Sequence, residues 1–203
     1  MQLAVTPELI NKYDLTGPRY TSYPTALQFT PEFKVNDYLY SIQDSNEDLV
    51  PHALSLYVHI PFCENICFYC ACNKIITRDR KKAEKYLDYL NREIGLKGKM
   101  FDRDRKVEQL HFGGGTPTYY TPQQLKQILD QLSSYFDISK NEQRDYSIEV
   151  DPRTVEAGTL GEIKKLGFNR ISFGVQDLNP QVQHLVNRSH SKTQIDVLVS
   201  AAR

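Results

Sequence analysis

The residues of this sequence that are best suited to chemistry are its four cysteines. They lie at positions 63, 67, 70 and 72 and follow the spacing C-x-x-x-C-x-x-C-x-C. Such a short segment cannot join distant parts of a secreted fold through disulfides, whereas thiolates are strong metal ligands. The clustering therefore predicts a metal site in a protein of a reducing compartment.

The cysteine spacing favours an iron–sulfur cluster over zinc. Cys63, Cys67 and Cys70 supply three ligands from one loop, and a cubane cluster held by three thiolates leaves one iron open for a chelating cofactor. Structural zinc usually draws two ligand pairs from separate hairpins, and only one tight group exists here. The spacing of bacterial ferredoxins, with two residues between each of the first three cysteines, does not match. A zinc-binding structural module is the alternative.

A glycine run at residues 113–115 is the second candidate site element. Residues without side chains let backbone polar groups approach a ligand closely. The run lacks the Gly-Lys-Ser/Thr ending of a P-loop and the G-x-G-x-x-G pattern of a dinucleotide turn. A simple turn is the alternative interpretation.

Three further polar residues follow later apolar runs. Glu149 lies near the end of one run, Gln176 just after the next, and Arg188 in the segment beyond it. Each one alone is more typical of a solvated group or a core hydrogen bond. Together they indicate a site, provided that the ends of those runs meet.

Four apolar runs predict the buried parallel strands that would bring these residues together, at residues 54–60, 107–112, 146–150 and 171–175. His59 and His111 lie within two of these runs. An imidazole between apolar neighbours is more often structural, so neither histidine is assigned a catalytic role.

Helical patterns separate the predicted strands. Apolar residues from Ala83 to Ile94 recur at steps of three and four, which places them on one helix face. A second helix starts after Thr121, where a proline suits the first position and Gln124 completes a capping box. The third covers about residues 154–166 and ends at Gly167, a natural left-handed cap.

This alternation predicts an α/β fold with a parallel sheet and right-handed crossovers. A barrel or partial barrel is favoured, and an open doubly wound sheet is the alternative that periodicity does not exclude. In both, the carboxyl ends of parallel strands share one edge. The cysteine loop, the glycine run and the three polar residues should therefore lie around the same mouth.

The two ends of the chain carry a different pattern. Residues 1–53 form no clear sheet unit and are interpreted as an N-terminal arm and lead-in segment, with residues 18–25 extended because each proline restricts its predecessor. Residues 54–203 hold four β/α units. A new helical pattern from Lys192 reaches Arg203 without a cap, and four strands would leave an unpaired edge. We therefore expect a truncated chain that lacks the rest of a barrel and a C-terminal domain.

The amino-acid composition and charge of the chain exclude several classes of protein. The chain has 203 residues, of which 40% are hydrophobic, as in ordinary globular proteins. Lys plus Arg and Asp plus Glu both number 25, so no net field recruits nucleic acid or anionic lipid. The sequence carries no secretory signal and no apolar stretch of the ~20 residues that span a bilayer. We expect a soluble, cytoplasmic protein without nucleic-acid binding or membrane insertion.

With these motifs, the sequence resembles the radical S-adenosylmethionine superfamily. Its signature is C-x-x-x-C-x-x-C with an aromatic residue before the third cysteine, the place that Tyr69 holds here. The resemblance implies a [4Fe-4S] cluster on Cys63, Cys67 and Cys70, with the amine and carboxylate of S-adenosylmethionine on the fourth iron. Reductive cleavage of that cofactor would yield a 5′-deoxyadenosyl radical, which the protein positions and shields.

The same resemblance implies two groups of cofactor contacts. Glu149 would bind ribose hydroxyls with Tyr57 and Tyr69 nearby, and the segment around Gly114 would contact the cofactor's amine. A second molecule of S-adenosylmethionine would lie against positions that match Gly115, Thr116, Gln176 and Arg188.

Three features make the sequence similar to the oxygen-independent coproporphyrinogen III oxidases: the segment PRYTSYPT at residues 18–25, the fourth cysteine in C-A-C-N, and the run FGVQD at residues 173–177. In this family the radical removes a hydrogen from a substrate propionate, and loss of carbon dioxide and an electron leaves a vinyl group. Two such steps convert coproporphyrinogen III to protoporphyrinogen IX in heme biosynthesis. We also expect a monomer and an electron donor such as flavodoxin or ferredoxin.

Substrate contacts are expected at the arm and at the fourth cysteine. Arg19 beside Tyr20 offers a cation for bidentate contact with a propionate, and Cys72 would lie near the second cofactor. A surface arginine is the alternative for Arg19. For the whole chain, the alternatives are a non-catalytic heme chaperone of the same superfamily and the zinc module.

Overall fold

The structure is a computed structural model that describes residues 6–14 and 28–203. The chain divides into two units, Met1–Tyr40 and Ser41–Arg203. Helix α1 (Pro7–Tyr13) belongs to the first, and α2 (Val35–Glu47) runs across the division. The extended arm expected at residues 18–25 lies outside the described residues, and the expected division into 1–53 and 54–203 remains a prediction.

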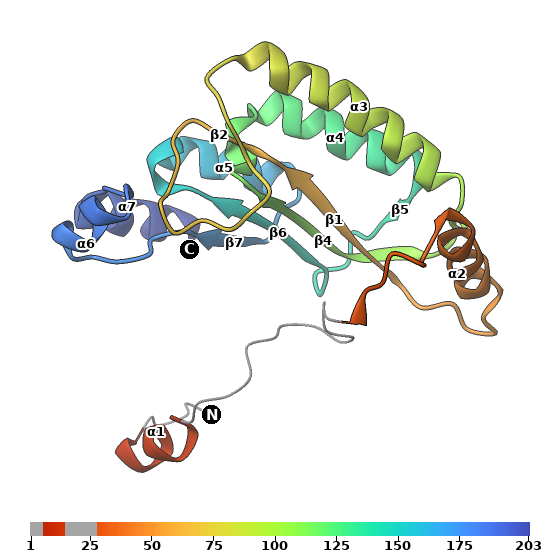
Figure 1. Ribbon diagram of the computed structural model, residues 1–203, viewed down its shortest axis with the longest axis horizontal. Coiled ribbons are helices and arrows are strands. Elements are labelled where there is room, and N and C mark those ends of the chain that lie inside the picture. Colours follow the sequence, from red (N-terminus) through yellow and green to blue (C-terminus); the bar gives the residue numbers. More distant parts are fainter. Residues whose placement is uncertain (1–5, 15–27) are drawn as a thin grey trace. The chain divides into compact units, whose positions relative to one another are not determined.

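A parallel sheet in the order β1-β4-β6-β7 forms the centre of the second unit (Figure 1). Each strand covers most of one apolar run, so the four strands expected from the sequence are confirmed. A short strand pairs with the start of β4 and was not expected. The bounds are β1 (Leu54–Ile60), β4 (Lys106–Gly114), β5 (Asp137–Ile138), β6 (Asp145–Val150) and β7 (Arg170–Phe173).

Helices α3 (Arg80–Gly98), α4 (Pro122–Tyr135) and α5 (Ala157–Lys165) lie on one face of this sheet (Figure 1). The capping box between Thr121 and Gln124 is present. Gly167 follows α5 with a positive φ of 102°, as the sequence predicted. The helix itself begins three residues later than expected, because residues 152–154 form the separate 3-10 turn η3 (Pro152–Thr154).

Two more helices follow β7. The short α6 (Pro180–Leu185) has no counterpart among the predicted elements. Helix α7 (Lys192–Ala202) matches the helical pattern that begins at Lys192 and packs against α5.

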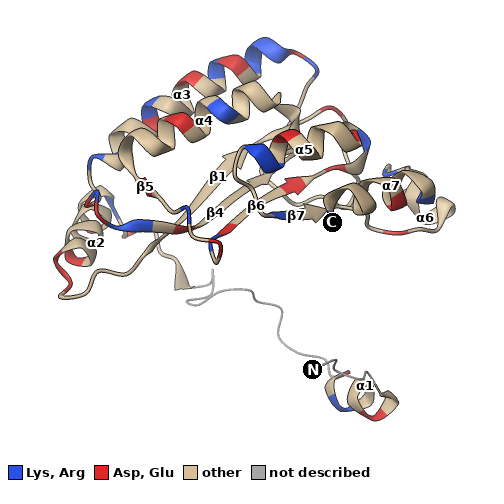
Figure 2. Ribbon diagram, turned by 180° about the vertical axis from the view of Figure 1, so that it is seen from behind, with Lys and Arg blue, Asp and Glu red and all other residues tan. Residues whose placement is uncertain are grey.

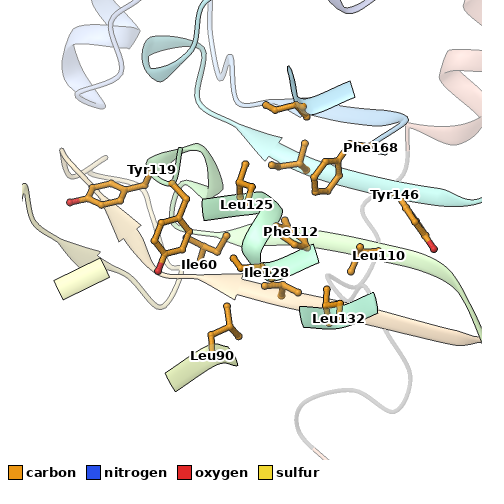
Figure 3. Close-up of a cluster of buried hydrophobic side chains, with 14 of the residues drawn as sticks. Ile60, Leu90, Leu110, Phe112, Tyr119, Leu125, Ile128, Leu132, Tyr146 and Phe168 are labelled. Atoms are coloured by element: carbon orange, nitrogen blue, oxygen red, sulfur yellow. The ribbon is translucent and has the colours of Figure 1, made fainter. Parts of the chain in front are cut away.

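The core lies between the sheet and its helices (Figure 3). Along β6, Tyr146, Ile148 and Val150 are buried and alternate with half-buried polar residues, so the apolar set faces the helices. Ile128 of α4 belongs to the same buried cluster and has no exposed surface. Burial of each such side chain contributes about 1.5–3 kcal/mol. These contacts hold the strand ends in fixed relative positions.

The opposite face of the sheet is polar, although its strands were predicted as buried. Tyr57 on β1 is 59% exposed, and His111 and Ser147 lie on the same face of β4 and β6. The apolar runs therefore bury one face only. The cysteine loop begins where β1 ends, at the carboxyl end of this sheet.

Acidic and basic residues are interspersed along α3, and α4 carries one of each (Figure 2). Lys126 and Asp130, one turn apart on α4, form an exposed ion pair at 2.6 Å. Among the helices of the described segments, none has the length and apolar character that crossing a membrane requires.

Candidate functional site

A small parallel pair of strands closes the base of the cysteine loop. In it, β2 (Phe62–Cys63) pairs with β3 (Ile75–Ile76), and Cys63 lies opposite Ile76. The Thr77 N–H donates to the Cys63 carbonyl at 2.9 Å. Because β2 follows β1 directly, the loop leaves the carboxyl end of β1 and returns beside it.

The tip of the loop is held by the segment after α6. The Phe68 N–H donates to the Val186 carbonyl at 3.2 Å, and the Asn187 side-chain amide donates to the Ile66 carbonyl at 2.7 Å. Asn187 has a positive φ of 55°, a conformation that Asn tolerates better than most residues. A segment about 120 residues downstream therefore supports the backbone on both sides of Cys67.

The glycine run crosses close to the chain that leaves β1. The Gly115 N–H donates to the Ile60 carbonyl at 2.8 Å, and a Cβ at Gly115 would lie 2.6 Å from the Pro61 carbonyl oxygen. Gly114 has a φ of 116°, which L side chains rarely adopt. Chain crossing and backbone conformation thus require glycine here, independently of any ligand.

A cavity of about 410 Å³ opens at this end of the sheet. The structure brings to it nearly all of the site residues expected from the sequence. Tyr57 is not in its wall and instead stacks on the His111 ring, with the ring centroids 5.7 Å apart. Arg19 and Tyr20 lie outside the described residues. The expected residues that line the cavity are Cys63, Cys67, Tyr69, Cys70, Cys72, Gly114, Gly115, Thr116, Glu149, Gln176 and Arg188.

The four thiols differ in their surroundings. Cys67 is buried, Cys63 and Cys70 are partly buried, and Cys72 is exposed. Burial raises the pKa of the Cys63 thiol, although a hydrogen bond with the Thr116 hydroxyl at 3.3 Å acts against it. Metal ligation requires the thiolate, so assembly of a metal site here must release this proton.

The chemistry of the thiols can be compared with the needs of a cluster and of a single ion. Within residues 6–14 and 28–203, no three His, Cys, Asp or Glu side chains converge on one metal ion. A structural zinc site requires four ligands around one ion. In a cubane cluster each thiolate binds a different iron, so the ligands need only surround a common space. Cys63, Cys67 and Cys70 do line one cavity.

Tyr69, the aromatic residue before the third cysteine, lines the cavity and is 48% exposed. Burial of its hydroxyl, reinforced by the neighbouring Cys67 and Cys70 sulfurs and opposed by the Arg188 charge, raises the pKa of Tyr69 to about 12. The phenol therefore stays neutral at physiological pH and remains able to donate a hydrogen bond.

Glu149 is oriented at the end of β6 by two residues of the neighbouring strand β4. Its Oε2 accepts from the Gly114 N–H at 3.2 Å, and its Oε1 lies 3.5 Å from His111 Nε2. The other ring nitrogen of His111 is 2.7 Å from the Ser147 hydroxyl. The Glu149 side chain remains 45% exposed. Its carboxylate is thus held in place and still has acceptor capacity toward the cavity.

The sequence interpretation missed Asp151 and Arg153, both of which line the cavity. Asp151 Oδ2 lies 2.9 Å from Arg188 Nη1 and 2.7 Å from Arg153 Nη2. Burial by itself would raise the pKa of Asp151, but hydrogen bonds from Arg153 and the charge of Arg188 outweigh it and lower that pKa. The sequence did contain one indication that Asp151 belongs to the site. Asp151 directly follows a predicted strand, at the end where the other candidate residues lie, and precedes a proline.

Arg188 connects this ion pair to the cysteine loop. Its Nη2 donates to the Gly174 carbonyl at 2.9 Å, and its Nη1 also lies 3.4 Å from Cys67 Sγ. Its Nε is buried and has no partner within the part of the chain that the structure describes. Nearby, Gln176 holds a positive φ of 70°, a costly conformation for a non-glycine residue. An unsatisfied buried donor and a strained residue in one wall are typical of a ligand site.

The sequence pattern of the radical SAM superfamily matches residues 57–203 of this chain. The chain belongs to the radical SAM superfamily. The matched part contains the second half of β1, the cysteine loop and every residue that lines the cavity.

This radical SAM chain is similar to several oxygen-independent coproporphyrinogen III oxidases. It is 50% identical to that of Pseudomonas aeruginosa over 196 residues, which cover 97% of the chain and 42% of the relative. It is 47% identical to that of Mannheimia haemolytica over 71% of the chain and 94% of the relative. The solved structure of the Escherichia coli coproporphyrinogen III oxidase, a radical SAM enzyme, superimposes with a TM-score of 0.81 at 44% identity, over 96% of this chain and 42% of that one.

The α/β fold class expected from the sequence is thereby confirmed. The chain spans about two fifths of the length of the P. aeruginosa and E. coli proteins.

Proposed function

We propose that this chain forms the cluster-binding and cofactor-binding part of an oxygen-independent coproporphyrinogen III oxidase. The observation that carries the proposal is the meeting of Cys63, Cys67 and Cys70 with Glu149 and Arg188 around one cavity. Relatives named for this activity are 47–50% identical to the chain, which supports the choice of reaction within the superfamily.

Three thiolates would hold the cluster. Cys63, Cys67 and Cys70 come from one loop whose base and tip are both fixed by backbone hydrogen bonds. Cys72 remains unligated, which leaves one iron open for the cofactor. When bound, the cluster supplies the electron that cleaves S-adenosylmethionine to a 5′-deoxyadenosyl radical. The protein's part is to keep the thiolates, the cofactor and the substrate in one orientation.

The cofactor would lie across the ends of β4 and β6. Glu149 is positioned to accept hydrogen bonds from the two ribose hydroxyls, with Tyr69 and the Gly114 segment beside it. Arg188, whose Nε lacks a partner among the described residues, would donate to a second S-adenosylmethionine. Gly115, Thr116 and Gln176 line the same cavity and complete that second subsite.

The substrate proposed is coproporphyrinogen III, whose propionates become vinyl groups in protoporphyrinogen IX. Its carboxylates require cations, and Arg19 with Tyr20 is the proposed source. Cys72, exposed at the cavity, would lie near the second cofactor and the substrate. We further propose a monomer in the cytoplasm that receives electrons from a donor such as flavodoxin or ferredoxin.

Anaerobic reconstitution tests the reaction. The protein as its gene encodes it is loaded with iron and sulfide and then given S-adenosylmethionine, a reductant and coproporphyrinogen III. We expect vinyl products together with 5′-deoxyadenosine. Deoxyadenosine without decarboxylation would contradict the substrate but keep the radical chemistry. One bound zinc and no sulfide would contradict the enzyme proposal altogether.

Replacement of Glu149 by Ala is expected to weaken binding of S-adenosylmethionine more than tenfold. Each hydrogen bond to a charged acceptor contributes about 1.5–3 kcal/mol, and the variant loses two. Equilibrium dialysis against iron-loaded protein measures the affinity. Glu108→Ala, an exposed carboxylate at the other end of β4, is the matched control. Unchanged affinity in a fully iron-loaded Glu149→Ala protein would show that the assignment is wrong.

A further inference from the structure

Arg153 is held by one carboxylate through both its backbone and its side chain. Asp151 Oδ1 accepts from the Arg153 backbone N–H at 3.0 Å and from its Nε at 3.1 Å. Asp151 Oδ2 accepts from Arg153 Nη2 at 2.7 Å. Arg153 Nη1 donates to the Asn187 carbonyl at 3.2 Å. A guanidinium anchored on three sides has little freedom to turn away from its remaining neighbour.

That remaining neighbour is the sulfur of a proposed cluster ligand. Arg153 Nη2 lies 3.7 Å from Cys67 Sγ, within reach of a hydrogen bond to sulfur. The side chains of Asp151 and Arg153 are 6% and 22% exposed, so water screens this contact weakly. Cys67 is itself buried.

The charges around Cys67 do not cancel. Two guanidinium groups, those of Arg153 and Arg188, approach its sulfur, and both pair with the single carboxylate of Asp151. One positive charge therefore remains beside the ligand. When a cluster takes up one electron, its net charge becomes more negative by one unit. A fixed positive charge and an N–H donor at a ligand sulfur stabilise that reduced state.

We propose that Arg153 is a positioning residue that raises the reduction potential of the cluster through Cys67. The inference rests on the proposed [4Fe-4S] site and adds a role for a residue outside the ligand and cofactor set. Arg188 contacts the same sulfur, but its proposed contact with the second cofactor would confound a test there. No cofactor contact is proposed for Arg153, so its substitution gives the simpler test.

The test is a redox titration of the reconstituted cluster in the absence of S-adenosylmethionine. Electron paramagnetic resonance monitors the reduced cluster at each potential. Wild type is compared with Arg153→Gln, which removes the charge, and Arg153→Lys, which keeps it without the planar fork. We expect Arg153→Gln to shift the reduction equilibrium about tenfold toward the oxidised state, which is about 59 mV for one electron. Arg153→Lys should fall between the two.

Arg170→Gln is the matched control, because Arg170 also pairs with an aspartate but lies at the start of β7 and is 68% exposed. Its potential should equal that of wild type. Equal cluster reduction potentials in wild type and Arg153→Gln would overturn this inference and leave the proposed function untouched. Loss of iron and sulfide only in Arg153→Gln would also overturn it, because the residue would then serve assembly. A wild-type protein that holds no cluster would overturn the proposed function together with the inference.

Discussion

Serine in place of Cys63, Cys67 or Cys70 is expected to abolish the iron–sulfur cluster, whereas serine in place of Cys72 should leave iron and sulfide content unchanged. All four thiols line the cavity, so proximity does not distinguish the ligands from the free cysteine. The number of ligands that a cofactor-binding cluster allows makes the distinction. A fourth thiolate would complete the coordination of the cubane and leave no iron for a cofactor to chelate.

Iron and sulfide analysis of each variant after anaerobic reconstitution measures this directly. Activity must be followed separately, because we propose that Cys72 lies near the second cofactor, and its loss is then expected to reduce turnover without loss of the cluster. Equal loss of iron and sulfide in all four variants would indicate a four-cysteine structural or electron-transfer site. Radical chemistry would then lose its main support.

Replacement of Asp151 by Asn is expected to lower the free energy of unfolding at neutral pH by about 3 kcal/mol. Removal of one partner from a buried ion pair costs about 3–5 kcal/mol, because the other charge is left uncompensated. Here two guanidinium groups lose the same partner. The lower end applies because Arg153 retains 22% exposure and is partly hydrated. Urea unfolding of the apoprotein measures the difference.

The effect of this substitution should depend on pH in one direction. The pKa of Asp151 is lowered in the folded protein, so the folded state favours the ionised carboxylate. Its contribution is complete above the unfolded-state pKa of about 4 and is lost as the pH falls through the folded pKa. The difference between wild type and Asp151→Asn should therefore shrink below about pH 4.

Asp130→Asn provides the control, since Asp130 also pairs with a cation but is 63% exposed on α4. Exposed pairs contribute about 0–1 kcal/mol, so this variant should unfold almost as wild type does. If the two variants lose the same small amount of stability, Asp151 does not act as the buried partner of two arginines.

The sequence by itself determined the features that depend on neighbours along the chain. The strand at residues 54–60 was predicted with the bounds that the structure has, because a short, mostly apolar run can be recognised without knowledge of its partner strand. Thr121 and Gln124 form the predicted capping box, which is a contact across three residues. The candidate metal ligands were found for the same reason, since one loop supplies them all.

Only the tertiary structure decided which distant groups meet at the site. Arg153 reaches Cys67 across 86 positions, a contact set by the order of strands and by the turn η3, and no local pattern encodes it. The need for glycine at position 115 likewise comes from the crossing of Pro61. Strand periodicity reports which residues share a face, but not which side chains converge beyond the strand ends. Convergence depends on packing between the layers, and that packing placed two arginines and Asp151 beside the cysteine loop.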